Sequence, residues 1–376
     1  MTESEPYHQQ ELFSMSIEKF FISRDPVYYE AWPDVVLTGD GTLVCVFCQC
    51  THHKDRSYTR IMQTESSDRG RTWSPKHPVT EGTEDRPYYF NCPRIFRLSG
   101  ERLGLLVDRI RHHLDEGAPD AADLLLFESA DNGRSWSAPR RLPLSGIVPD
   151  KLVRSDSGRL FLSAHHSFQG RLAPFLISSD DGGETWTSPR KMAYDPDCEL
   201  CEASLLPLGG GVIAALLRDN TCRGADCRKL ISRDDGETWS SLLDFPLPGG
   251  YRPVAGLLND GRILITYRFC QGGRRAIGAN TQNLFAALTT RADLLEEQRS
   301  QTSVNILPVD HDRSVHADTG YSGWVQFPDG EIYIVNYIVD DAGDRAQIRG
   351  YSLFPDEIVL SPQPPQPEIS RNSAQP

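Results

Sequence analysis

The chain has 376 residues, 39% hydrophobic and 24% charged, a balance typical of a globular protein that buries a sizeable core. Its 39 Lys and Arg residues stand against 52 Asp and Glu residues, and the formal charge of -13 excludes nucleic acid as an expected partner. The start of the chain lacks the basic and apolar regions of a secretory signal, and no later stretch is apolar for the length of a membrane span. We therefore expect no membrane contact, a cytoplasmic location and reduced thiols at the nine cysteines.

After an N-terminal extension, residues 1–16, the segment 17–23 has the composition of a strand but no local partner. The chain then repeats one unit, a pair of short apolar strands joined by a turn that contains Gly. Successive pairs begin roughly 50 to 70 residues apart, a period typical of propeller blades. The six pairs cover residues 32–50, 92–109, 149–166, 201–220, 252–270 and 321–337.

A second repeat, Ser-x-Asp-x-Gly-x-Thr/Ser-Trp, follows each of the first four pairs. The Asp and Gly of this pattern suit a tight hairpin, since Asp accepts hydrogen bonds from nearby backbone N–H groups and Gly adopts positive φ. We expect each copy to join the third and fourth strands of a blade at the outer rim, in a structural role. The copies are residues 66–73, 129–136, 179–186 and 232–239.

The last blade offers only one further strand, near residues 347–353, and blade 5 has no such box in residues 280–298. We expect the N-terminal strand to complete blade 6, which closes the ring and removes its exposed edges. The predicted fold is all-β, a six-bladed propeller of four-stranded antiparallel blades in one domain, residues 17–361. The Pro-rich tail, residues 362–376, is expected to be disordered.

The ends of the paired strands define a candidate site, because the innermost strands of a propeller meet around a central channel. Charged residues recur at these otherwise apolar strand ends, and buried charge must be paired or used. The first strands begin at Trp32, Cys92, Pro149, Glu202, Arg252 and Tyr321, and the second strands end at Cys48, Asp108, His165, Arg218, Arg268 and Tyr337. A wet channel lined by solvated charges is the alternative interpretation.

The Ser-x-Asp-x-Gly-x-Thr/Ser-Trp boxes resemble the Asp-boxes of the sialidase (neuraminidase) superfamily. In those enzymes a Tyr nucleophile opens blade 6 within a Tyr-Ser pair, which Tyr321-Ser322 matches. The resemblance implies that Glu202 deprotonates this Tyr and that Arg218 grips the substrate carboxylate. A phenol needs such a partner, because it is a poor nucleophile at neutral pH.

The acid/base Asp of sialidases lies in the loop after the second strand of blade 1, where Asp55 falls in this sequence. A solvated loop carboxylate is the alternative interpretation of Asp55. Three histidines, His52, His53 and His165, are alternative proton donors.

Two positions depart from the sialidase pattern. Ala31 stands where the first of three carboxylate-binding arginines is expected, and the usual place of the third holds Asn280, Gln282 and Asn283. We expect Arg252, Arg268, Arg274 or Arg275 to substitute for the third. Arg–carboxylate contacts are geometrically demanding, so these changes predict an altered substrate.

The resemblance implies an exo-glycosidase that retains anomeric configuration and releases a terminal acidic sugar from a small carbohydrate or glycoconjugate without a cofactor. Its predicted catalytic residues are Tyr321, Glu202 and Asp55, and its predicted substrate-binding residues are Arg218, Arg268, Arg252, His165, Asp108 and Tyr337. A non-catalytic carbohydrate-binding propeller and a uronic-acid hydrolase or lyase stay open. Cys198, Cys201, Cys222 and Cys227 resemble a four-thiolate zinc pattern, but their spacing favours ordinary packing.

Overall fold

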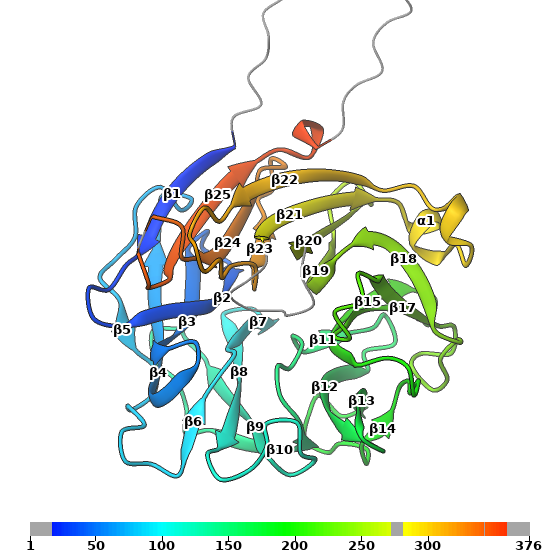
Figure 1. Ribbon diagram of the computed structural model, residues 1–376, viewed down its shortest axis with the longest axis horizontal. Coiled ribbons are helices and arrows are strands. Elements are labelled where there is room, and N and C mark those ends of the chain that lie inside the picture. Colours follow the sequence, from blue (N-terminus) through cyan, green and yellow to red (C-terminus); the bar gives the residue numbers. More distant parts are fainter. Residues whose placement is uncertain (1–16, 272–280, 342, 359–376) are drawn as a thin grey trace, which may run out of the picture.

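The computed structural model describes residues 17–271, 281–341 and 343–358 as six antiparallel sheets, the blades of a propeller. The blades follow one another around a central axis in chain order (Figure 1). This arrangement confirms the predicted all-β, six-bladed fold. The segments 1–16 and 362–376 lie outside the described residues, so the predicted extent of the domain stays a prediction.

Each blade runs from an inner strand beside the axis to an outer strand at the rim. Blades 1 and 2 consist of β2 (Tyr29–Leu37), β3 (Leu43–His52), β4 (Asp55–Ser66) and β5 (His77–Pro78), then β6 (Tyr88–Phe90), β7 (Arg94–Ser99), β8 (Arg102–Arg111), β9 (Ala122–Ser129) and β10 (Arg140–Ser145). Blades 3 and 4 consist of β11 (Val153–Arg154), β12 (Leu160–Phe168), β13 (Arg171–Ser179) and β14 (Arg190–Lys191), then β15 (Leu200–Gly209), β16 (Val212–Asp219), β17 (Asp226–Ser232) and β18 (Leu243–Pro248).

Blades 5 and 6 consist of β19 (Gly250–Leu257), β20 (Ile263–Gln271), β21 (Thr281–Thr289) and β22 (Asn305–His311), then β23 (Gly323–Gln326), β24 (Ile332–Ile338), β25 (Gln347–Leu353) and β1 (Glu18–Ser23). In blade 5, α1 (Arg291–Leu295) and η1 (Arg299–Gln301) stand between the third and fourth strands, where blades 1 to 4 carry a box. A further turn, η2 (Pro355–Glu357), follows β25. No helix among the described residues is long and apolar enough to cross a membrane.

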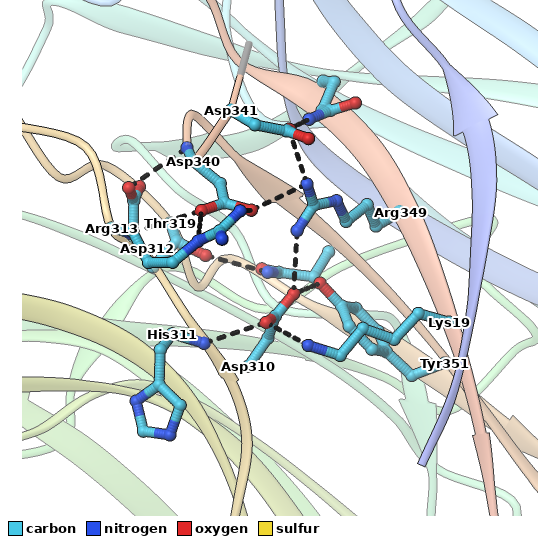
Figure 2. A network of polar contacts seen from close by, with 12 residues as sticks. Lys19, Asp310, His311, Asp312, Arg313, Thr319, Asp340, Asp341, Arg349 and Tyr351 are labelled. Atoms are coloured by element: carbon cyan, nitrogen blue, oxygen red, sulfur yellow. Dashed lines mark hydrogen bonds and ion pairs between the residues drawn. The ribbon is translucent and has the colours of Figure 1, made fainter. Parts of the chain in front are cut away.

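The N-terminal strand β1 pairs antiparallel with β25, as predicted, and so closes the ring (Figure 1). Figure 2 shows the charge network that fastens this closure around Asp310 at the end of β22. Lys19 of β1 lies 2.5 Å from Asp310, while Arg349 and Tyr351 of β25 contact the other oxygen of that carboxylate at 3.2 and 2.8 Å. Blades 5 and 6 and the first strand therefore meet at a single buried carboxylate.

The four Asp-boxes lie between the third and fourth strands of blades 1 to 4, as predicted. In each, the first Ser accepts a hydrogen bond from the Gly N–H, and Asp accepts from the following Thr or Ser. The Gly carbonyl then accepts a hydrogen bond from the preceding blade, so each box also joins two blades. These donors are Tyr333 to Gly70 at 2.7 Å, Gln63 to Gly133 at 2.8 Å, Arg140 to Gly183 at 2.9 Å and Arg190 to Gly236 at 3.2 Å.

Three inner strands contain a bulge next to the axis. The pairing register shifts in β2, β15 and β19, and at each shift one residue has positive φ: Trp32 at 53°, Glu202 at 52° and Arg252 at 50°. Positive φ is uncommon for residues other than Gly, and a bulge re-aims the side chain that it carries. The bulges therefore set where these three side chains point, and they occur at three of the six predicted channel positions.

Candidate active site

A cavity of about 350 Å³ lies among the ends of the inner strands. Side chains from several blades contribute to its wall. The lining includes Trp32, Arg56, Asn91, His165, Glu202 and Tyr321. The cavity is large enough for a single sugar ring, because ligand sites of about 300 Å³ or more hold small molecules.

Tyr321 and Glu202, 119 residues apart in sequence, meet in the wall of this cavity. Tyr321 Oη donates a hydrogen bond to Glu202 Oε1, and the two residues are only 7% and 4% exposed. Gly320, with φ of 97°, precedes Tyr321, and its Cα lies so close to Arg268 that a Cβ would come within 2.6 Å of that side chain. The turn before β23 therefore requires Gly, and it delivers Tyr321 to the carboxylate.

Arg218, near the end of β16, fixes the ionisation of this pair. Its Nη1 donates to Glu202 Oε1 at 2.8 Å and lies 3.4 Å from Tyr321 Oη. Burial alone would raise the pKa of Glu202, but Arg218, Arg252 and the Tyr321 hydrogen bond lower it below its usual value. Burial and the neighbouring Glu202 raise the pKa of Tyr321 well above its usual value. The site therefore holds a neutral phenol against an ionised carboxylate that can accept its proton.

Arg252 and Arg268 lie against the ring of Tyr321, with guanidinium carbons 5.8 and 4.7 Å from its centroid. Arg268 Nη2 donates to Tyr337 Oη at 2.5 Å, and its Nε donates to the Thr319 carbonyl. Neither arginine lines the cavity, so the structure places both beside the phenol and away from the open space. Two buried cations at this distance stabilise negative charge on the Tyr321 oxygen. Two further candidate substitutes, Arg274 and Arg275, lie outside the described residues.

Arg56 is a cavity-lining residue that the sequence interpretation missed. Its guanidinium carbon lies 3.8 Å from the centroid of the Trp32 ring, and its Nη2 donates to Asn91 Oδ1 at 3.3 Å. Its Nη1 is buried without a hydrogen-bond partner among the described residues. Ala31, at the position of the expected arginine, is fully buried opposite Cys48. Blade 1 therefore supplies an arginine to the cavity from β4, although β2 does not.

His165 lies in the cavity wall and supports Glu202. Its Nδ1 accepts a hydrogen bond from the Glu202 backbone N–H at 3.2 Å. Burial lowers the pKa of His165 to about 4, so the imidazole is neutral at pH 7. It therefore orients the bulge that carries Glu202.

Asp108 and Tyr337 are buried behind the cavity and do not line it. The Asp108 carboxylate accepts hydrogen bonds from the backbone N–H groups of Cys92 at 2.7 Å and Val148 at 2.8 Å, and thus fastens two blades together. Burial raises the pKa of Asp108. Tyr337 Oη donates to Asp318 Oδ1 at 2.7 Å. The structure gives both residues protein partners in place of the predicted substrate contacts.

Asp55, the predicted acid/base residue, lies at the tip of the β3–β4 hairpin. It is exposed, pairs with His52 across the turn and accepts a hydrogen bond from the Ser57 N–H at 2.9 Å. It does not line the cavity, whereas its neighbours His53 and Arg56 do. The structure therefore does not bring Asp55 together with Tyr321 and Glu202.

The cysteine cluster shows no metal geometry. Cys227 Sγ donates to the Leu217 carbonyl at 3.3 Å, and Cys222 Sγ donates to the Asn220 carbonyl at 3.6 Å. In the part of the chain that the structure describes, no group of three or more His, Cys, Asp or Glu side chains is arranged to hold a metal ion.

Comparison with known proteins identifies the family. Residues 84–334 match the BNR repeat-like domain, which is more than half of the chain. The chain belongs to this family. It is a divergent, sialidase-like BNR propeller, and its sequence is 24% identical to a sialidase of Paraclostridium sordellii over 198 residues, 43% of this chain and 48% of that protein. A sialidase of Clostridium perfringens is 27% identical over 177 residues, 45% of this chain and 43% of the relative.

Solved structures share the fold of this BNR propeller. A protein of unknown function from Dyadobacter fermentans matches with a TM-score of 0.70 and 21% identity, over 90% of this chain and 98% of that one. A Hadza microbial sialidase matches with a TM-score of 0.64 and 17% identity, over 88% of this chain and 66% of that one. The BNR propeller spans about half the length of the sialidases that it matches in sequence.

Proposed function

We propose that this BNR propeller is an exo-acting, retaining glycosidase that removes a terminal acidic sugar from an oligosaccharide or glycoconjugate. The observation that carries the proposal is the buried hydrogen bond from Tyr321 to Glu202 at the wall of the central cavity. The weak sequence similarity to sialidases supports the same class of reaction.

The reaction begins with attack of Tyr321 Oη on the anomeric carbon while Glu202 takes the phenol proton. The phenol alone is too weakly acidic for this step, and Glu202 is the base within hydrogen-bond reach. Arg218, Arg252 and Arg268 surround the oxygen and ring on which negative charge develops when the tyrosyl bond later breaks. A neutral nucleophile also avoids repulsion of an anionic substrate, which is the reason for a Tyr in this class of glycosidase.

Arg56 is the proposed anchor of the acidic group. Its unpaired Nη1 and its place in the cavity wall suit a carboxylate, for which guanidinium is the best-matched protein group. The stacking of Arg56 on Trp32 restricts its movement and thereby lowers the cost of binding. Arg56 reaches the cavity from β4, whereas the arginine expected from the sialidase pattern would reach it from β2. We therefore expect the distance between the acidic group and the anomeric carbon of the substrate to differ from that in a sugar bound by an arginine of β2.

A second candidate, a carbohydrate-binding propeller without catalysis, is favoured by two observations. Ala31 supplies no cation at the first expected arginine position, and Arg252 and Arg268 are turned toward Tyr321. Such a protein would bind acidic sugars in the cavity and turn over none.

The test is turnover of aryl glycosides of sialic, ketodeoxy and uronic acids by the wild-type protein and by Tyr321→Phe. We expect the wild type to hydrolyse one of these classes with retention, and Tyr321→Phe to lose more than about 1,000-fold in kcat. A fluorinated analogue of the preferred sugar should label Tyr321, as detected by peptide mass spectrometry. Full activity of a folded Tyr321→Phe variant would contradict the nucleophile, and binding without turnover would favour the second candidate.

A further inference from the structure

A second cavity, of about 440 Å³, lies beside the central one, between the β3–β4 hairpin and the loop that precedes Tyr321. Its wall includes Tyr29, His52, Lys54, Val315 and Asp318. One side chain, His53, lines both cavities. A substrate with its sugar in the central cavity and its leaving group in this side cavity would cross from one to the other beside the His53 imidazole.

Asp318 holds that imidazole in place. Its Oδ2 pairs with His53 Nδ1 and also accepts a hydrogen bond from Tyr29 Oη at 2.5 Å, while its Oδ1 accepts one from Tyr337 Oη at 2.7 Å. Burial by itself would raise the pKa of Asp318, but His53, Arg268 and Tyr29 lower it below its usual value. Asp318 is therefore an ionised carboxylate that its contacts with His53, Tyr29 and Tyr337 hold in position.

A backbone contact also holds Asp318 in position. The Asp318 N–H donates to Asp312 Oδ2 at 2.9 Å, so the loop before Tyr321 is tied down at the residue that grips His53. His53 Nε2 makes no hydrogen bond to any described residue, and its side chain is 18% exposed. The rings of His53 and Trp32 are close to perpendicular, with centroids 5.2 Å apart, and Trp32 also lines the central cavity. One nitrogen of His53 is thus committed to Asp318, and the other is available to a ligand.

We propose that His53, oriented by Asp318, is the general acid and base of this enzyme, and that the side cavity receives the leaving group. This inference rests on the proposed function. In the first step the glycosidic C–O bond breaks, its electron pair stays on the leaving oxygen, and His53 Nε2 gives that oxygen its proton. Meanwhile Tyr321 Oη bonds to the anomeric carbon and its proton passes to Glu202.

In the second step His53 Nε2 takes a proton from a water molecule, whose oxygen bonds to the anomeric carbon. The bond from that carbon to Tyr321 breaks, and the phenolate recovers its proton from Glu202. Atoms and charges balance over the two steps, and no other reactant is needed. Asp55, at the exposed tip of the same hairpin, has no comparable position between the two cavities.

The side cavity also indicates the class of leaving group. The rings of Tyr29 and His52 lie 5.1 Å apart in its wall, and Val315 and Val339 add apolar surface. Sugars and aryl groups pack on such faces through their C–H or ring surfaces. We infer a neutral sugar or an aryl group as the aglycone.

The test compares leaving groups, because a good leaving group departs without protonation and a poor one does not. For His53→Ala we expect a loss of at least 100-fold in kcat/KM with a methyl or sugar aglycone, and less than 10-fold with a dinitrophenyl aglycone. Azide should restore turnover of the dinitrophenyl substrate and give a glycosyl azide of retained configuration. His77→Ala, on the outer strand β5, is the matched surface control.

Asp318→Asn tests the positioning role. Because Asn keeps the size of the side chain and removes its charge, we expect a smaller loss with the same dependence on the leaving group. Thermal melting identifies a folding defect, in which case the His53→Ala data alone decide the proposal.

Equal losses of His53→Ala on good and poor leaving groups would overturn the proposal, as would a leaving-group-dependent loss in Asp55→Asn. Tyr321→Phe separates this inference from the proposed function. If Tyr321→Phe is inactive while His53→Ala behaves like the wild type, the role of His53 is rejected and the proposed function stands. If Tyr321→Phe is active, the role of Tyr321 as nucleophile, and with it the proposed function, is rejected.

Discussion

The outer rim and the central channel of this propeller use carboxylates in opposite ways. At the rim, Asp68 and Asp131 are partly buried and Asp234 is exposed, and hydrogen bonds within their own boxes lower the pKa of each to about 2. At the channel, Glu202 is buried, and although burial by itself would raise its pKa, Arg218, Arg252 and the hydrogen bond from Tyr321 lower it. The rim position is the same residue in every box, whereas the residue at the start of the first strand, the position of Glu202, differs in every blade. The residues that recur in each box therefore stabilise the blades, whereas the residues that differ between blades form the candidate site.

The sharpest test of this comparison replaces one carboxylate residue of each region by Ala. Glu202→Ala should lower kcat by about 1,000-fold or more, because it removes the base that takes the Tyr321 proton. Asp131→Ala should leave kcat unchanged and lower the free energy of unfolding by about 1–3 kcal/mol, since Ser135 loses its acceptor. Steady-state kinetics and urea unfolding of both variants measure the two effects. A large loss of kcat in Asp131→Ala would break the distinction between rim and channel.

A second prediction concerns the joint that a box makes with its neighbouring blade. Gly70 has φ of 83°, and a Cβ there would lie 2.2 Å from the ring of Tyr333, so Gly70→Ala should cost about 2–4 kcal/mol of stability. Gly158→Ala is the matched control, because Gly158 has φ of 93° but no atom within 4 Å of such a Cβ. We expect the control to cost about 1 kcal/mol, from backbone strain alone. Equal urea midpoints for the two variants would show that contact with Tyr333 carries no penalty.

Much of the rim was predictable because its determinants are local. The box residues bond within eight positions of one another, and the strand pairs alternate with short turns, so pattern alone gave the blades and the closing strand β1. The site was predictable only in part. Tyr321 and Glu202 came from resemblance, and their contact depends on bulges and a Gly turn that spacing does not reveal.

The β3–β4 hairpin explains why Arg56 was missed and why Asp55 was preferred to its neighbour His53 as the acid/base residue. Side chains alternate between faces along a strand, so a shift of one residue in the turn changes which of its neighbours faces the cavity. The turn pairs His52 with Asp55, which leaves Asp55 exposed and brings His53 and Arg56 to the cavity. The Asp318 contact spans 265 residues, and no local pattern signals it.

The channel should also respond to pH where the rim does not. The pKa of His165 is about 4 in the folded protein and about 6.5 when exposed, so between these values the unfolded chain binds the extra proton. Stability is therefore complete above about pH 6.5 and falls toward pH 4, by roughly 3 kcal/mol for this group. His165→Gln should reduce this loss in urea unfolding at pH 7 and pH 4.5, and His77→Gln, at the rim, should not. An unchanged pH dependence in His165→Gln would show that His165 is not buried as a neutral imidazole.

The smallest expected effect separates binding from chemistry inside the channel itself. Arg56→Ala should raise KM about 10–100-fold and change kcat less, because Arg56 lines the cavity and does not contact Tyr321 or Glu202. Arg56→Lys should recover part of the loss, since an ammonium keeps the charge and loses the planar stacking on Trp32. Arg102→Ala, which removes a surface ion pair with Glu128, is the control and should alter neither constant. A fall in kcat equal to that in kcat/KM would instead place Arg56 in the transition state, and the anchor of the acidic group would have to lie elsewhere in the cavity wall.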